Sequence, residues 1–243
     1  MFHEILIQTY IWIGFFVLIV LLVIKWQANK KTPEDSSVSP PEKVNTIPSQ
    51  ADKAELAVDA ALRGLQENRY FVFRDLIIPS SSKKVELTQI DHVLVCRLGI
   101  FCIETKSNHG YIYGFTQRQD WKQYLGYNAK PYTFHSPYRQ NKHHVSSLEL
   151  LLVDNLKAPI HSYLAFPNAK KVVINGRIED MSPEGVVSKI NKHMNSIYEP
   201  ADIERIAKIL AHAGTFREQL RNKHVDDVKA FIDAKVAETL KLS

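Results

Sequence analysis

The hydrophobic positions begin with one long apolar run at the N-terminus. Residues 5–24 are almost entirely apolar, and about 20 such residues are enough for a helix to cross the hydrocarbon core of a membrane. Lys25, Lys30 and Lys31 follow this run, whereas no Lys or Arg precedes it. We therefore expect residues 1–26 to form a transmembrane anchor in the cell membrane. Because positive charge stays inside, the N-terminus should lie outside and the rest of the chain in the cytoplasm.

A polar segment follows the apolar run. Residues 27–50 are rich in Lys, Ser, Glu and Pro and contain few apolar side chains, so they cannot form a core of their own. We expect a flexible linker here. The rest of the chain, residues 51–243, is long enough to form one domain around a single core.

Beyond the linker, the hydrophobic positions recur with the periods of helices and strands. Asp52 is expected to cap the first of the helices, and Ser136 the second, with Pro137 at its first position. A strand meander followed by alternating strands and helices predicts an α/β fold with helices on both faces of the sheet. The sequence predicts helices at 51–68, 137–152, 185–194, 200–213 and 225–240, and strands at 70–78, 86–95, 100–106, 110–115, 163–166 and 172–174.

Three charged residues lie within these strongly apolar strands. Asp91 interrupts the second predicted strand, and Glu104 and Lys106 lie at the end of the third. Charged side chains in such places are costly unless they are paired or bound to a cation. Glu104 and Lys106 are two residues apart, so they point to the same face of the sheet.

The turn between these two strands decides where Asp91 lies. A four-residue loop at 96–99 would pair Val95 with Ile100 and place Asp91 opposite Glu104, with Cβ atoms about 4.5–5.5 Å apart. Two carboxylates at that distance would accommodate a Mg²⁺ ion between them. A three-residue loop would shift the register and separate the two faces. The charged residues would then be explained equally well as a structural ion-pair network.

Composition and charge exclude little. The net charge of +5 and the pI of about 9.0 fit binding to a polyanion, but also a domain beside anionic lipid. Cys96 and Cys102 form no CxxC motif and lie in apolar runs. We therefore expect reduced, buried thiols and no cysteine zinc site.

Four stretches of the sequence combine into one pattern: residues 88–95, residues 99–106, residues 110–114 with Trp121, and residues 136–141. Taken together, they resemble the NERD (nuclease-related) domain, a branch of the PD-(D/E)xK nuclease superfamily. The likeness extends over roughly residues 51–165 and implies a restriction-endonuclease-like core, with a mixed sheet flanked by helices. The first helix lacks the family's usual glycines, and Ser136–Pro137 stands where the family usually has Asn-Pro.

The resemblance implies roles for individual residues. Asp91 and Glu104 would be metal ligands, and Lys106 would be the catalytic lysine. Glu55 falls where the family has an acidic residue on its first helix, so it is a further candidate ligand. The implied cofactor is Mg²⁺ or Mn²⁺. With only two cysteines, the chain cannot form the zinc module that some members use to hold DNA.

Residues near these motifs add further candidates. Gln140 is expected to reach the catalytic site, and Arg139 could bind substrate phosphate. Gln89 shares a face with Asp91 and is another candidate for substrate binding. His143 and His144 are better explained as part of an exposed, polar first turn of the helix.

Three other polar or aromatic residues allow two readings each. His92 points away from Asp91, so packing is favoured over a role in the site. Trp121 and Tyr124 could stack on bases or cover a sheet edge.

The expected function is therefore that of a membrane-anchored, metal-dependent nuclease that hydrolyses phosphodiester bonds, with DNA as the favoured nucleic acid. The alternative is a binding module that holds nucleic acid or a protein partner at the inner face of the membrane without cutting. Metal dependence would distinguish the two, because only the nuclease requires a cation for its reaction.

Overall fold

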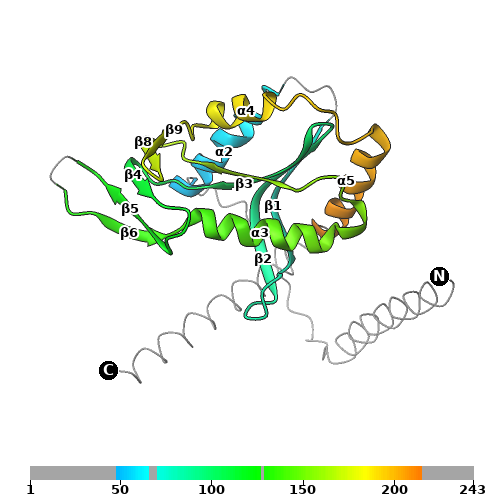
Figure 1. Ribbon diagram of the computed structural model, residues 1–243, viewed down its shortest axis with the longest axis horizontal. Coiled ribbons are helices and arrows are strands. Elements are labelled where there is room, and N and C mark those ends of the chain that lie inside the picture. The colour runs from blue at the N-terminus through cyan, green and yellow to red at the C-terminus, as the bar shows by residue number, and fades with distance from the viewer. Residues whose placement is uncertain (1–47, 66–69, 127–128, 215–243) are drawn as a thin grey trace, which may run out of the picture. The chain divides into compact units, whose positions relative to one another are not determined.

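The computed structural model describes residues 48–65, 70–126 and 129–214 (Figure 1). The expected anchor at 1–26, the linker up to residue 47 and the helix expected at 225–240 lie outside the described residues. Over the described ranges, no helix is long and apolar enough to span a membrane.

The elements follow the predicted order, with three short strands that the sequence did not predict: β5, β6 and β9. These strands carry several polar or charged residues and show little apolar alternation, so no strand pattern marks them. The elements are α2 (Gln50–Leu62), β1 (Tyr70–Pro79), β2 (Leu87–Cys96), β3 (Gly99–Thr105), β4 (Gly110–Gly114), β5 (Asp120–Tyr124), β6 (Tyr132–His135), α3 (Pro137–Leu151), the 3-10 turn η1 (Val153–Asn155), β7 (His161–Ala165), β8 (Ala169–Ile174), β9 (Arg177–Glu179), α4 (Pro183–Asn191) and α5 (Pro200–Gly214).

The strands form two sheets rather than the one mixed sheet that was expected. The first has the order β1-β2-β3-β7, with β7 parallel to β3 and the other pairs antiparallel. The second has the order β6-β5-β4-β8-β9 and is also mixed. Two mixed sheets with flanking helices fit a restriction-endonuclease-like core.

The hairpin between β2 and β3 has the predicted register. Val95 pairs with Ile100 and Cys96 with Gly99. The last pair of this ladder is His92 with Ile103. Beyond it, the side chain of Asp91 accepts a hydrogen bond from the backbone N–H of Thr105, next to Glu104.

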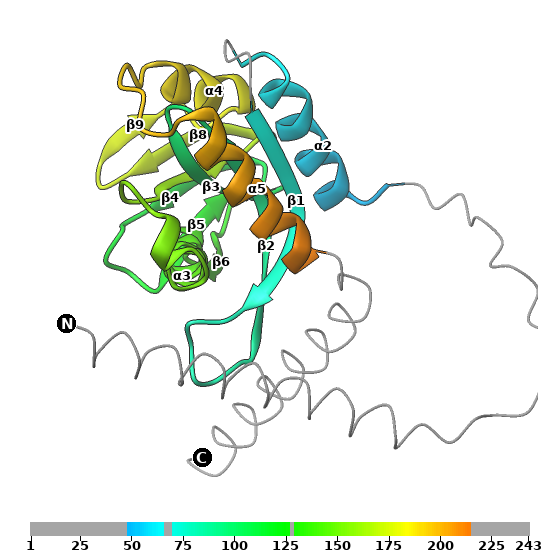
Figure 2. The same ribbon diagram turned by 90° about the vertical axis from the view of Figure 1, so that its right-hand side faces the viewer.

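Helices cover both faces of the first sheet, as predicted. On one face, side chains of α3 and α5 pack with Val93, Val95 and Cys102. On the other face, side chains of α2 and α4 pack with Leu94 and Phe101. Figure 2 shows α2 on one side of β1 and α3 on the other. Asp91 and Glu104 have the parity of the first set, so they face the layer that contains α3.

The helix caps agree only in part with the sequence. Ser136 caps α3, because its side chain accepts a hydrogen bond from the backbone N–H of Arg139. The cap of α2 is Ser49, so the expectation for Asp52 was wrong. Asp52 is instead the reciprocal partner in a capping box, where its side chain accepts from the backbone N–H of Ser49.

Trp121 lies in the core beneath the second sheet. It is fully buried, and its ring stacks against that of Phe166 with centroids 6.3 Å apart. The hypothesis that Trp121 stacks on bases is therefore wrong. Tyr124 belongs to the opposite face of the same strand, because the two residues are three apart.

Gly114 leaves room for the Trp121 ring. A Cβ atom at residue 114 would lie 2.1 Å from Cδ2 of that ring. We expect Gly114→Ala to lower the free energy of unfolding by about 1–3 kcal/mol, as overpacked cores do. Urea denaturation measures the change. Gly126→Ala is the matched control, because a Cβ there meets no atom within 4 Å; equal losses in both variants would contradict this reading.

Candidate active site

Glu104 is the centre of a polar cluster at the end of β3. Its side chain is only 1% exposed, and its Oε1 lies 2.7 Å from Nζ of Lys106. The same Nζ donates a hydrogen bond of 3.0 Å to Oε1 of Gln140 on α3. The structure thus brings together three of the residues that the sequence selected.

Asp91 reaches this cluster from β2. Its Oδ2 accepts a hydrogen bond of 2.8 Å from the backbone N–H of Thr105. Burial, and then the negative charge of Glu104, raise the pKa of Asp91 to about 8. The two carboxylates are therefore close enough to oppose each other's ionisation.

His144 also belongs to the cluster, contrary to the expectation of an exposed residue. It is buried, and its Nε2 lies 3.1 Å from Oε2 of Glu104. Its Nδ1 lies 3.0 Å from Oγ1 of Thr88. The sequence did contain a signal for this position: His144 is four residues after Gln140, so both point to the same side of the helix.

Cations and donors around Glu104 keep it ionised. Burial by itself would raise the pKa of this carboxyl group, but His144 and Lys106 more than offset burial, and the pKa is lowered overall. At neutral pH the pair therefore holds one carboxylate, Glu104, beside an Asp91 that resists ionisation.

Asn141 fixes α3 against the sheet. Its amide nitrogen donates to the carbonyl groups of Cys102 and Tyr163 and to Oγ of Ser162. The thiol of Cys102 donates back to Oδ1 of Asn141. Because Asn141 is buried among these partners, its neighbour Gln140 is held at a defined distance from β3. Both cysteines are buried and form no disulfide, as expected.

Glu55 and Gln89 lie beside the cluster and have other partners. Oε2 of Glu55 is 3.3 Å from Nη2 of Arg74, and the charge of Glu55 also contributes to the raised pKa of Asp91. Gln89 donates a hydrogen bond of 3.0 Å to Oδ1 of Asp75. Asp75, which no sequence pattern had selected, is buried and has a positive φ of 52°, a conformation that residues other than glycine seldom adopt.

Arg139 is separate from the buried cluster. It is exposed and lines a polar cavity of about 640 Å³ with Lys142 and His143. His143 lies within hydrogen-bonding distance of Ser80 and Ser81, in the loop after β1. Burial lowers the pKa of His143, so Arg139 and Lys142 are the residues that make this surface basic and suited to phosphate contacts.

His92 packs on the opposite face, as the sequence favoured. Its side chain is fully buried, and its Nε2 lies 3.1 Å from Oδ1 of Asp59 on α2. The same carboxylate accepts a hydrogen bond from Arg74. His92 therefore ties the sheet to α2 and has no contact with the Glu104 cluster.

The donor set around Glu104 suits a hard divalent cation. Its Oε2 is buried and receives no well-directed hydrogen bond, although His144 is close. The carboxylate oxygens of Asp91 and Glu104 are the ligands that Mg²⁺ prefers, together with water and phosphate oxygens. Within the described ranges, no three His, Cys, Asp or Glu side chains are placed to hold a metal by themselves, so water and substrate would complete the shell.

Comparison with known proteins assigns the domain. Residues 50–167 match the sequence model of the nuclease-related domain. An uncharacterized protein of Bacillus anthracis is 26% identical over 184 residues, which cover 74% of this chain and 84% of that protein. No solved structure matches the chain. The matched region contains strands β2 and β3 and helix α3, which supply the Glu104 cluster. Residues 50–167 of the chain therefore form a nuclease-related domain.

Proposed function

We propose that this chain is a metal-dependent nuclease that hydrolyses phosphodiester bonds, with DNA as the expected substrate and Mg²⁺ or Mn²⁺ as the cofactor. One observation carries the proposal: buried Glu104 contacts both Lys106 and His144, and its charge acts on the neighbouring carboxyl group of Asp91. A packed core has no need of two opposed carboxylates, and their mutual repulsion is relieved by a bound cation.

Each residue of the cluster has a distinct role in this proposal. Asp91 and Glu104 would hold the metal ion. Lys106 is already a hydrogen-bond donor to Gln140 and Glu104, so its ammonium group would stabilise the negative charge that grows on the phosphate. Gln140 and Glu104 keep that ammonium group in place. When bound, the ion would polarise the phosphate and lower the pKa of an attacking water molecule.

Three residues outside the cluster receive roles from their charge and their position in the fold. Arg139 would contact the phosphate backbone from the neighbouring basic cavity. Glu55 is close enough to affect the pKa of Asp91 and would act as a further ligand only after leaving Arg74. Gln89 would contribute to substrate binding from β2, where its side chain donates a hydrogen bond to Asp75.

The proposed place of action is the inner face of the cell membrane. The apolar run and the lysines that follow it support a single-pass anchor with a cytoplasmic domain. Fractionation of cells that express the full-length chain tests this point. Release of the protein by salt or carbonate washing would contradict a membrane-spanning anchor.

The nuclease activity is tested with the full-length chain and labelled single-stranded and double-stranded DNA and RNA. The reactions contain Mg²⁺, Mn²⁺ or EDTA. The proposal expects cleavage that requires a metal and that is lost on Glu104→Gln. A folded wild-type protein that cuts none of these nucleic acids with either metal would overturn the proposal and favour the non-catalytic binding module.

His144 gives a more specific expectation. Because it orients Glu104, we expect His144→Ala to reduce the cleavage rate by about 10- to 100-fold and to raise the Mg²⁺ concentration needed for half-maximal activity. Initial rates over a range of Mg²⁺ concentrations measure both effects. His143→Ala is the matched control, since His143 contacts Ser80 and Ser81 instead, and its metal requirement should stay unchanged. An unchanged metal requirement in both variants would exclude this role.

A further inference from the structure

The outer face of the second sheet exposes a row of aromatic side chains. Along β4, Ile112 points into the core, while Tyr111 and Tyr113 point outward and are 36% and 40% exposed. Phe115 follows with the same parity and is 54% exposed. Residues two apart in a strand are separated by roughly 6.6 Å, so the rings of Tyr111 and Tyr113 follow each other at this spacing along β4.

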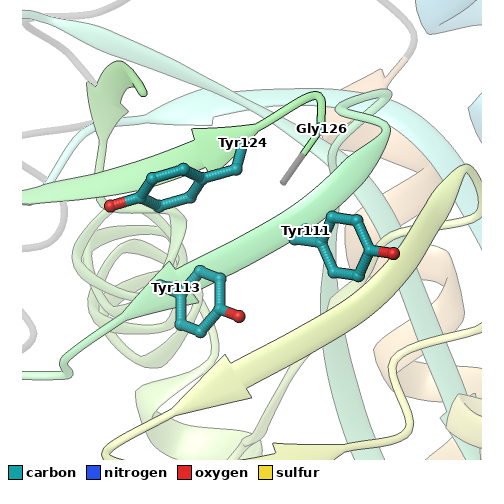
Figure 3. A pocket seen from close by; sticks show the side chains of 4 residues that line it. All are labelled: Tyr111, Tyr113, Tyr124 and Gly126. Carbon is teal, nitrogen blue, oxygen red and sulfur yellow. The ribbon is translucent and has the colours of Figure 1, made fainter. Parts of the chain in front are cut away.

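Neighbouring strands widen this row. On β5, Tyr124 pairs with Tyr111, and Lys122 pairs with Tyr113. On β8, Lys171 lies beside Tyr111. The rings of Tyr113 and Tyr124 meet edge to face, with centroids 5.5 Å apart at 86°. Figure 3 shows the three tyrosines projecting from β4 and β5 into the same open space.

Two cavities lie on this face and share Tyr113. The first, of about 460 Å³, is lined by Tyr111, Tyr113, Tyr124 and Gly126. The second, of about 570 Å³, extends past Phe115 and reaches two basic residues, Arg118 and Lys122. Tyr113 thus lies between two neighbouring hollows on the same face of the sheet. We call this surface the tyrosine face and define it by Tyr111, Tyr113, Tyr124, Lys122 and Lys171.

The tyrosine face combines exposed aromatic rings with lysine side chains, and this combination suits one class of ligand. Exposed aromatic faces stack on bases, and interleaved lysines attract the phosphates that connect those bases. A duplex keeps its bases stacked on each other, so their faces are available only in single strands. On this face, Lys122 and Lys171 outnumber Asp120, which lies on the same side of β5 as Lys122. The charge pattern therefore favours a polyanion over an acidic or neutral peptide.

We propose that the tyrosine face binds single-stranded nucleic acid by base stacking and holds it on the same domain as the Glu104 cluster. The proposal deepens the nuclease function and rests on it for the identity of the substrate, because it adds that a single-stranded segment is recognised apart from the cutting site. Tyr111, Tyr113 and Tyr124 supply the stacking surfaces, and Lys122 and Lys171 contact the phosphates.

Binding is measured without cutting. Fluorescence anisotropy of labelled 12-nucleotide dT and dA strands, and of a duplex of equal length, is followed with the full-length chain in EDTA. We expect the single strands to bind more tightly than the duplex. Tyr111→Leu and Tyr113→Leu should each weaken binding by about 5- to 100-fold, as loss of one stacking ring does, whereas Tyr113→Phe should stay within about threefold of wild type because the ring remains.

The same sheet provides a matched control. Tyr132 is exposed on β6 and pairs with Gln123, whose side chain points to the opposite face from Tyr124. Tyr132→Leu should therefore leave affinity unchanged. Lys122→Gln should weaken binding and reduce its dependence on salt. Equal losses for Tyr132→Leu and Tyr113→Leu, or preferential binding of the duplex, would overturn the proposal.

The two proposals, the nuclease and the tyrosine face, can be contradicted separately. Wild-type cleavage with unaltered oligonucleotide binding in the tyrosine variants would overturn the tyrosine face and leave the nuclease in place. Ring-dependent binding in EDTA without cleavage in any metal would support the tyrosine face and overturn the nuclease. Failure of wild type to bind any strand would overturn the tyrosine face, and a protein partner would become the candidate occupant.

Discussion

Replacing Lys106 with methionine is expected to reduce the rate of metal-dependent cleavage by at least about 100-fold. Methionine keeps most of the length and apolar contact of the side chain but removes the ammonium group, which contacts Glu104 at 2.7 Å and Gln140 at 3.0 Å. Loss of one preorganised donor to the charge of a transition state has effects of this size. Single-turnover cleavage at saturating enzyme measures the chemical step separately from substrate binding.

Lys189 offers a close control for this substitution. It is 28% exposed, against 25% for Lys106, and it also contacts a carboxylate, that of Glu179 at 3.3 Å. Lys189→Met should cut at the wild-type rate. If Lys106→Met keeps its rate within about threefold of wild type, Lys106 is a structural ion-pair partner, and the catalytic assignment is wrong.

The second large effect concerns stability rather than rate. The pKa of Asp91 is raised from 3.8 to about 8 in the folded protein, so folding favours the protonated carboxyl group. The stabilisation is complete below the unfolded pKa and is lost as pH rises through about 8. We therefore expect Asp91→Asn, which cannot ionise, to make the metal-free protein more stable than wild type at pH 8.5, by on the order of a few kcal/mol.

Thermal unfolding in EDTA at pH 5 and pH 8.5 measures this difference. At pH 5 the advantage of Asp91→Asn should be smaller than at pH 8.5, because Asp91 is then still protonated in the folded state and the pH has risen only a little above the unfolded pKa of 3.8. Mg²⁺ should raise the unfolding temperature of wild type more than that of Asp91→Asn, since binding to the folded state alone stabilises it. Asp154→Asn, at an exposed position, is the control, and a lower stability of Asp91→Asn at pH 8.5 would contradict the raised pKa.

Local rules accounted for most of the elements. The β2–β3 register followed from the turn between Cys96 and Gly99, because a short turn fixes which residues face each other. The cap at Ser136 and the opposite faces of Asp91 and His92 followed in the same way from short-range geometry. These features depend on neighbours within a few residues, so a single sequence contains the information for them.

Features that depend on segments far apart in the chain could not be predicted from the sequence. The second sheet unites β4 and β8, which lie far apart in the chain, and its short strands β5, β6 and β9 have little apolar pattern of their own. Trp121 was therefore open to two readings until Phe166 and Gly114 were seen against its ring. Packing between elements, and not local preference, buries this side chain.

For the candidate site, the sequence alone selected Asp91, Glu104 and Lys106 from their charge in apolar strands together with a family pattern, and Gln140 from its place beside the family motifs. Only the tertiary structure placed His144 beside Glu104 and Gln89 beside Asp75. The reason is physical. Strand alternation determines which side chains share a face, but the docking of α3, held by Asn141 against β3 and β7, decides which helix residues reach that face.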